Sequence, residues 1–306
     1  MNAVAEPVLA GQVEWWGSPG VWLAAGRATP TNEALVAALR ERGVRAQIAE
    51  PGKLRRLVRR EDVVLGRLDV RPTLDGVEDG IWELRHLQRV GIRVLNSTAS
   101  LVACHDKLQT ALRLGRLGIP QPATAHVDRE TPLRRFDFPV VLKPRFGSWG
   151  ADVVLCESEA DLSYRLAEMH DRPWFRRQGV IVQALVPPAG FDLRLVVAGG
   201  QVVGAIERVA AAGEWRTSIA LGGTRRQVTP PSDACALAVM AAAAVKADVI
   251  GVDLLPSVDG RYVVLELNGA VDFTSEYSLP GQDVFDEAAR SLEGVTAGRL
   301  YRRSSI

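Results

Sequence analysis

The stretch GVDLLPSVDGRYVVLELN, residues 251–268, contains two apolar runs on either side of an Asp-Gly pair. Asp-Gly between two strand-like runs is a strong local signal for a β-hairpin with a two-residue turn. With that pair in the centre of the turn, Asp253 faces Glu266 across the two strands. Because side chains alternate between the two faces of a strand, Asn268 lies on the same face as Glu266. The predicted hairpin therefore brings two carboxylates and one amide oxygen together.

Such charges within hydrophobic strands would cost on the order of several kcal/mol if they were buried without a partner. Oxygen ligands that include carboxylates suit Mg²⁺, particularly an ion shared with the phosphates of a nucleotide. The alternative is a polar cross-strand cluster that faces solvent. Pro256 interrupts the hydrogen-bond ladder, so an edge strand, a bulge or a longer loop are alternatives to the simple hairpin.

The composition is that of a globular protein of two or three domains, with 306 residues, 47% hydrophobic and 24% charged. A net charge of +1 gives no reason to expect binding to nucleic acid or to a membrane. The three cysteines are far apart, so we expect neither a disulfide framework nor a zinc site. We also find no membrane span and no signal peptide, which together predict a cytoplasmic protein.

Strand and helix patterns alternate over the first ninety-odd residues, which predicts a small α/β domain with a parallel sheet. Because ligands of such sheets bind outside the carboxyl ends of the strands, Arg67 and Asp69 are candidates for substrate contact; the alternative is ordinary loop charge. The predicted strands are Val21–Ala25, Val44–Ala49, Val63–Leu68 and Ile92–Leu95, and the predicted helices run to about Arg42 and over Ile81–Val90.

The segment Lys53–Arg60 has Leu54, Leu57 and Val58 at helical spacing, which leaves five basic residues on the other face. A helix face of this kind is commonly only solvated. The alternative is a docking surface for an acidic partner, because clustered positive charge steers association.

A second unit begins near Asn96 with a helix that carries His105-Asp106-Lys107 and continues to Gly115 or Gly118. Two strands follow, and the loop PRFGSWG, residues 144–150, lies between them. Its glycines let backbone N–H groups approach phosphates, and Lys143 at its base supplies a positive charge. The loop is therefore predicted to fold over a nucleotide; a hairpin turn without function is the alternative.

The remaining chain starts with a strand over Gly179–Val186, the Pro-Pro-Ala-Gly hinge after it, and a hairpin in which Asp192 and Arg194 share a face. Simple alternation places Arg208 opposite Phe191 and off that face, so a shared site requires a bulge or a strong twist. A long polar loop over 213–223 is expected to be functional. Helices are predicted from Pro231 or Ser232 to about Ala247 and over Asp283–Leu292.

In this order the motifs resemble the RimK-like branch of the ATP-grasp superfamily of carboxylate–amine ligases. VLKPRFGSWG at 141–150 and CHDK at 104–107 are similar to the LysX-type ligases, which join an amino acid to the C-terminal glutamate of a small acidic carrier protein. The resemblance covers roughly residues 20–293. It implies an N-terminal parallel α/β domain (1–96), a central ATP-grasp subdomain with the phosphate flap (97–184) and a C-terminal ATP-grasp subdomain with the metal site (185–306).

The resemblance also implies roles for single residues. The residues implied to bind ATP are Lys107, Lys143, Gly147, Ser148, Trp149, Gly150, Gln183, Ala184, Val186 and Asp192. The implied ligands of Mg²⁺, two ions with Mn²⁺ as a substitute, are Asp253, Glu266 and Asn268. The implied catalytic residues on the acyl-phosphate side are Arg194, Arg208 and Arg216. Ala184 stands where an acidic residue is common in this family, so no side-chain contact to the nucleotide is expected there.

The expected reaction is ADP-forming amide synthesis through an acyl phosphate. The expected partners are an amino acid and an acidic carrier protein that docks on Lys53–Arg60, and a homo-oligomer is a further expectation. Two alternatives remain: an alpha-L-glutamate ligase that extends a cofactor or a peptide tail, and an ATP-binding regulatory protein without turnover.

Overall fold

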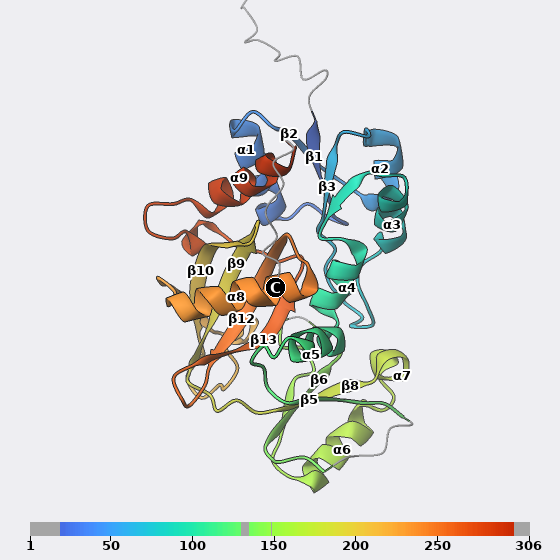
Figure 1. Ribbon diagram of the computed structural model, residues 1–306. Coiled ribbons are helices and arrows are strands. Elements are labelled where there is room, and N and C mark those ends of the chain that lie inside the picture. Colours follow the sequence, from blue (N-terminus) through green and yellow to red (C-terminus); the bar gives the residue numbers. More distant parts are fainter. Residues whose placement is uncertain (1–18, 130–134, 148, 297–306) are drawn as a thin grey trace, which may run out of the picture.

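The computed structural model describes residues 19–129, 135–147 and 149–296 of the chain. A parallel sheet of four strands comes first in the sequence, then an antiparallel sheet of four strands and an antiparallel sheet of five. The five-stranded sheet lies between the other two in space (Figure 1). This mixed architecture confirms the predicted fold class. The domain limits at residues 96 and 184 stay a prediction.

The N-terminal sheet forms from short buried strands that alternate with helices, in the order β2-β1-β3-β4, and all neighbouring strands are parallel. Helix α1 begins with two favourable residues: Thr29 Oγ1 accepts the backbone N–H of Asn32, and Pro30 occupies the first helical turn. The elements are β1 (Gly20–Ala24), α1 (Pro30–Glu41), β2 (Arg45–Ala49), α2 (Pro51–Leu57), β3 (Val63–Gly66), α3 (Ile81–Arg89) and β4 (Arg93–Leu95).

The helix predicted over Lys53–Arg60 is shorter than expected. Helix α2 ends at Leu57, and Val58 is extended with ψ 132°. Leu54 is buried, whereas Leu57 is 44% exposed. The prediction of one apolar helix face was therefore wrong at Leu57, which is the last residue of α2, whereas Val58 after the helix packs against the same core cluster as Leu54.

The single helix predicted through residues 105–107 consists of two helices. Asp106 ends α4 (Thr98–His105) and begins α5 (Lys107–Arg116), with a non-helical ψ of 102°. Its Oδ1 accepts the first free N–H groups of α5, those of Leu108 and Gln109, at 3.1 and 3.3 Å. Asp106 is therefore an N-cap residue that turns the chain and places Lys107 at the start of the second helix.

The central sheet has the strand order β5-β8-β6-β7, and its lower face in Figure 1 carries α6. The sequence analysis missed β5 and α7, which have four and six residues and are too short to show a clear hydrophobic period. The elements are β5 (Thr124–Val127), β6 (Val140–Pro144), β7 (Val154–Cys156), α6 (Glu159–Met169), α7 (Pro173–Gln178) and β8 (Val180–Ala184).

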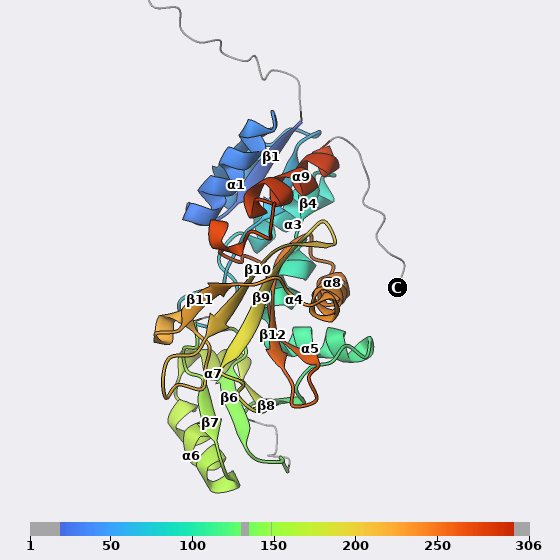
Figure 2. The ribbon, with the colours of Figure 1, turned by 90° about the vertical axis from the view of Figure 1, so that its left-hand side faces the viewer.

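The five-stranded sheet has the order β11-β10-β9-β12-β13, and α8 covers one of its faces (Figures 1 and 2). Its edge strand β11 was not predicted; all four of its residues are exposed, so it lacks a hydrophobic pattern. The elements are β9 (Phe191–Ala198), β10 (Gln201–Val209), a 3₁₀ turn (Ile219–Leu221), β11 (Thr224–Gln227), α8 (Ser232–Val245), β12 (Val249–Pro256), β13 (Tyr262–Asn268), a 3₁₀ turn (Ser275–Tyr277) and α9 (Val284–Thr296).

A β-bulge in β10 changes the pairing expected for Arg208. The register with β9 shifts between Val202 and Gly204, so Arg208 lies opposite Asp192. A Cβ atom on Gly204 would lie 2.5 Å from a methyl group of Val284, so the close approach of α9 requires glycine here. The bulge therefore places Arg208 on the same face of the sheet as Arg194, which simple alternation without a bulge would not do.

The hairpin turn at Asp259-Gly260 differs from the predicted two-residue turn. Ser257 N–H donates to the Arg261 carbonyl at 2.7 Å, which encloses three residues, and Gly260 N–H donates to the Ser257 carbonyl. Gly260 has φ 77°, the left-handed conformation expected at the third loop position. The extra turn residue moves the register of the two strands by one.

A bulge in β13 restores the predicted register at Asp253. Leu254 pairs with Val264 but Asp253 pairs with Glu266, so Leu265 is the extra residue of a bulge in β13. The predicted pairing of Asp253 with Glu266 is thus confirmed, although the two-residue turn on which it was based was wrong.

Helix α9 returns from the end of the chain to the N-terminal sheet, where it packs against α1 (Figure 2). One buried cluster contains Val21 and Leu39 from the N-terminal sheet and helix, Val196 from β9, and Ala288 and Leu292 from α9. The N-terminal sheet and α9 therefore share a hydrophobic core. Among the described residues, no helix is long and apolar enough to cross a membrane.

Candidate active site

A cavity of about 360 Å³ lies at the junction of the three sheets. Sixteen residues were predicted for the site, and Ser148 lies outside the described residues. All the others line this cavity: Lys107, Lys143, Gly147, Trp149, Gly150, Gln183, Ala184, Val186, Asp192, Arg194, Arg208, Arg216, Asp253, Glu266 and Asn268. The fold thus gathers side chains that are up to about 160 residues apart in the sequence.

One end of the cavity is apolar and belongs to the segment after β8. Leu185 and Val186 line it together with Val141, Leu255 and Leu265. These aliphatic walls suit a flat aromatic ring such as adenine. The backbone N–H groups of Ala184 and Leu185 already donate to carbonyl groups of the protein. An adenine base bound here would therefore have to form hydrogen bonds with other backbone groups of this segment.

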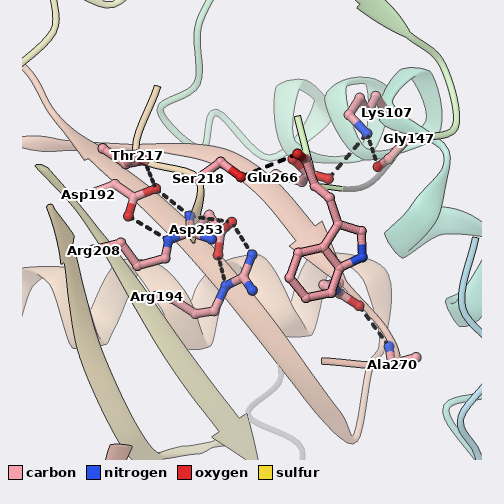
Figure 3. A network of polar contacts seen from close by, with 12 residues as sticks. Lys107, Gly147, Asp192, Arg194, Arg208, Thr217, Ser218, Asp253, Glu266 and Ala270 are labelled. Carbon is pink, nitrogen blue, oxygen red and sulfur yellow. Dashed lines mark hydrogen bonds and ion pairs between the residues drawn. The ribbon is translucent and has the colours of Figure 1, made fainter. Parts of the chain in front are cut away.

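Two lysines mark the next part of the cavity. Lys107 Nζ donates to the Gly147 carbonyl at 2.9 Å and lies 3.2 Å from Glu266 Oε1 (Figure 3). Lys143 Nζ donates to Gln183 Oε1 at 2.7 Å. Lys143 is only 5% exposed, and burial lowers its pKa to about 8. An anion in the cavity would therefore be attracted to both ammonium groups and would stabilise the charged form of Lys143.

Arginines and aspartates form a network in the same cavity (Figure 3). Arg194 binds Asp253 through two hydrogen bonds of 2.7 Å, and Arg208 donates to Asp253 at 2.8 Å. Arg208 also forms two bonds with Asp192, and Thr217 Oγ1 donates to the same carboxylate at 2.7 Å. Burial alone would raise the pKa of Asp253, but the two guanidinium groups lower it well below the ordinary value. Asp253 is therefore a buried carboxylate whose charge is fully compensated.

The oxygen atoms suited to a metal come from the hairpin of β12 and β13. Asp253 and Glu266 are paired across the strands, and Asn268 Oδ1 accepts the Ala270 N–H at 3.0 Å. Among the described residues, no three His, Cys, Asp or Glu side chains form a metal-binding group. The candidate set therefore needs the Asn268 amide as its third donor. Two carboxylates and an amide oxygen fit Mg²⁺ or Mn²⁺. Asp253 Oδ2 accepts from both Arg194 and Arg208, so Oδ1, which accepts only from Arg194 among the described residues, is the Asp253 oxygen with a second lone pair for a metal.

The loop over 213–223 lies against the segment between β6 and β7. Ser218 Oγ donates to the Trp149 carbonyl at 3.3 Å, and Arg216 Nη1 donates to the Val153 carbonyl at 3.1 Å. The rest of the Arg216 guanidinium binds Glu214, which lowers the pKa of that carboxyl to about 2. Two loops from different sheets therefore cover the same side of the cavity.

The cavity also reaches residues that the sequence analysis did not select. Thr31 follows the cap of α1, and Asp272, Phe273 and Tyr277 follow the hairpin. Of the two candidates after β3, Asp69 lines the cavity, whereas Arg67 lies beneath it and is 3% exposed. No motif distinguishes Thr31, Asp272, Phe273 and Tyr277: Thr31 lies in the first turn of α1, and the other three lie in the segment after β13.

Residues 104–291 match the family model described as the RimK-like ATP-grasp domain. The chain belongs to the RimK-like ATP-grasp family. Its relatives include mouse beta-citrylglutamate synthase B, with 30% identity over 242 residues, 75% of this chain and 60% of the mouse protein. This RimK-like chain thus spans about 60% of the length of that relative.

Two prokaryotic relatives of the same family are covered more fully. A probable alpha-L-glutamate ligase of Aeromonas salmonicida is 31% identical over 76% of this chain and 77% of its own length. The glutamate–LysW ligase ArgX of Sulfurisphaera tokodaii is 30% identical over 68% of this chain and 76% of its own length. The RimK-like relatives named here are all ligases or synthases.

The fold is also that of solved ATP-grasp ligases. The superposition on D-alanine–D-alanine ligase from Bacillus anthracis, complexed with ATP, covers 92% of this chain and 98% of the ligase chain. The TM-score is 0.67 and the sequence identity is 18%. The superposition on a RimK domain protein from Sphaerobacter thermophilus covers 90% of this chain and 99% of that protein, with a TM-score of 0.64 and 23% identity. At these identities the likeness concerns the RimK-like fold alone.

Proposed function

We propose that this protein is an ATP-dependent, ADP-forming carboxylate–amine ligase that joins an amino acid to the C-terminal glutamate of a carrier protein or peptide. One observation carries the proposal: a single cavity contains two lysines, four arginines and the three oxygen donors of the hairpin, next to an apolar end that suits adenine. This is the set of groups that phosphoryl transfer to a carboxylate requires.

In the first step a substrate carboxylate attacks the γ-phosphorus of ATP, which gives an acyl phosphate and ADP. The protein contributes position and positive charge to this step. Lys107 and Lys143 hold phosphate oxygens, and the flap from Gly147 to Gly150 covers them. Asp253, Glu266 and Asn268 would hold Mg²⁺, which when bound would neutralise phosphate charge.

In the second step the amine attacks the acyl carbonyl carbon and phosphate leaves. Negative charge develops on the carbonyl oxygen, and a fixed guanidinium suits that charge. Arg208 is the group we assign, because Asp192 and Asp253 hold it in place from two sides. Stabilisation of this kind is typically worth about 3 kcal/mol in the transition state.

The acyl phosphate reacts with water, so the site needs cover. The contact between Ser218 and Trp149 joins the 213–223 loop to the flap, and Arg216 joins the same loop to Val153 next to the flap. We therefore assign the exclusion of water to these two loops together.

A carrier protein as the acyl substrate is supported by the ArgX relative, whose name includes LysW. On this chain, Arg55, Arg56, Arg59 and Arg60 on and after α2 are exposed and give the N-terminal domain a basic surface. We propose that this surface docks an acidic carrier, since the opposite charges would steer the encounter.

A second candidate function is an alpha-L-glutamate ligase that extends a peptide or cofactor tail. The Aeromonas relative, which carries that name, supports it. Both candidates use the same cavity and the same acyl phosphate. They differ only in the molecule that provides the carboxylate.

The test is product analysis. The purified protein is incubated with ATP, Mg²⁺ and each of twenty amino acids, with and without a lysate of the host cell, and the products are examined by mass spectrometry. We expect ADP together with a new species heavier by one amino-acid residue, on a small protein for a carrier-dependent ligase and on a small molecule or peptide for the alternative. Nucleotide binding with no ADP and no new product under any condition contradicts both functions.

A further inference from the structure

A small notch opens beside the main cavity at the carboxyl ends of β1 and β3. Its volume is about 20 Å³, which is room for one water-sized group. Asp69, Ala270 and Asp272 line both the notch and the main cavity. A ligand in the main cavity can therefore place a single atom in the notch.

Arg67 forms the charged wall of the notch. Its Nε donates to Asn32 Oδ1 and its Nη2 to the Val271 carbonyl, both at 2.8 Å. Nη1 is buried and has no hydrogen-bond partner among the described residues. A buried donor without an acceptor is unfavourable, and an anionic oxygen would satisfy both its hydrogen bond and its charge. Exposed Arg27 and half-buried Glu78 line the same notch with opposite charges, and Glu78 Oε2 accepts the Asp69 N–H at 3.0 Å.

Two carboxylates lie next to the guanidinium on the side of the main cavity. Asp272 Oδ1 accepts from Thr29 Oγ1 at 3.1 Å and lies 3.7 Å from Arg67 Nη2. Asp69 lies 3.9 Å from His105 Nδ1, but burial lowers the pKa of that ring to about 4 and keeps it neutral. Burial and the charge of Asp272 raise the pKa of Asp69. A cation between these two carboxylates would relieve both effects.

We propose that this end of the cavity holds the head group of an α-amino acid, with one oxygen of its α-carboxylate on Arg67 Nη1 and its α-ammonium group between Asp69 and Asp272. The inference rests on the proposed ligase function and names the subsite of its amine substrate. Mixed charge is the reason for the choice: an anion alone would meet the carboxylates of Asp69, Glu78 and Asp272, and a cation alone would meet Arg67.

The position of the subsite agrees with an amine that must reach the reacting carbonyl group. Asp272 is four residues after Asn268 in the chain, and Ala270, which binds Asn268 Oδ1, lines the notch. The head group would therefore lie directly beside the oxygen donors of the hairpin. The side chain of the amino acid would extend into the main cavity, toward Phe273 and Tyr277.

Calorimetry with matched probes tests the subsite without the chemical step. The protein, saturated with ADP and Mg²⁺, is titrated with L-glutamate, with glutarate, which lacks the amine, and with γ-aminobutyrate, which lacks the α-carboxylate. Because each lost group forfeits a charge-assisted contact, L-glutamate is expected to bind at least about tenfold more tightly than either analogue.

Variants assign each half of the head group to its residue. Arg67→Gln should lose the preference for L-glutamate over γ-aminobutyrate, and Asp69→Asn should lose the preference over glutarate. Two exposed positions far from the notch, changed as Arg89→Gln and Asp233→Asn, are matched controls and should keep both preferences. The affinity for ADP serves as the check of folding. Arg67 bonds to both Asn32 and Val271, so Arg67→Gln could fail to fold. In that case the preference of the Asp69→Asn variant for L-glutamate over glutarate tests the proposed subsite.

Equal binding of the three probes, or an unchanged preference in the Asp69→Asn variant, overturns the inference. So does the absence of L-glutamate binding. Product formation in the ligase assay with another amine would in that case leave the proposed function standing, so the two proposals fail separately.

Discussion

Asp253→Asn and Glu266→Gln are expected to stop ADP formation equally, but only the first should destabilise the fold. Both side chains are proposed metal oxygen donors, and each variant removes a negative charge from the hairpin. Their surroundings differ. Asp253 is 4% exposed and accepts three hydrogen bonds from two arginines. Glu266 has a side chain 31% exposed and one ion pair, with Lys107 at 3.2 Å.

The magnitude follows from what each substitution leaves behind. Without the Asp253 carboxylate, the guanidinium groups of Arg194 and Arg208, whose side chains are 18% and 11% exposed, retain only Asp192 as an acidic partner in the network. Loss of one partner of a buried ion pair costs about 3–5 kcal/mol, and an asparagine oxygen keeps one of the bonds. We therefore expect a loss of about 3 kcal/mol for Asp253→Asn. Glu266→Gln loses a partly exposed ion pair, worth at most about 1 kcal/mol.

Urea denaturation followed by circular dichroism measures the difference, with ADP release measured on the same preparations. The exposed Asp233→Asn on α8 is the control and should change stability by less than about 0.5 kcal/mol. The reasoning is refuted if Asp253→Asn is as stable as the parent protein, or if Glu266→Gln is equally destabilised. Normal ADP formation in Glu266→Gln would remove that residue from the metal site.

Three further predictions concern charge and buried hydrogen bonds. Burial lowers the pKa of Lys143 to about 8, and bound phosphates favour its charged form, so ADP affinity measured by calorimetry should fall above pH 8 by at most about tenfold per pH unit. Lys143→Met should remove most of this pH dependence. In the unmodified protein without ADP, Lys143 binds more protons in the unfolded state than in the folded state between pH 8 and about 10, so the free energy of unfolding should rise with pH over that window. Asn96→Gly keeps the φ of 47° but removes side-chain bonds to five backbone groups, of Gly66, Asp248, Val249 and Gly269. Urea denaturation should therefore show a loss of about 3–4 kcal/mol, against about 1 kcal/mol for the single bond lost in Gln121→Ala. Replacement of both Arg55 and Arg56 by serine should weaken binding of an acidic carrier and reduce its salt dependence in a pull-down or calorimetric assay, whereas unchanged binding would move the docking surface elsewhere.

Much of the fold could be predicted because strand and helix periods, caps and turn residues are local properties of the sequence. The parallel N-terminal sheet follows from alternating strands and helices, and the pairing of Asp253 with Glu266 follows from the alternation around Asp-Gly. Even so, the pairing held only because a three-residue turn and a bulge at Leu265 compensate for each other. Short elements such as β5 and the exposed β11 lacked a period to detect.

The sequence by itself determined which residue types would form the site, because motifs such as VLKPRFGSWG and the Glu266–Asn268 pair are contiguous or nearly so. Only the tertiary structure decided which of them bind each other. Asp253 meets Arg194 across 59 residues of chain, and Arg67 reaches Val271 across 204. The bulge in β10, which places Arg208 opposite Asp192, is accompanied by the close approach of α9 to Gly204. The physical reason is that ion pairing and burial depend on distances in space, which local patterns of hydrophobicity and turn formation do not encode.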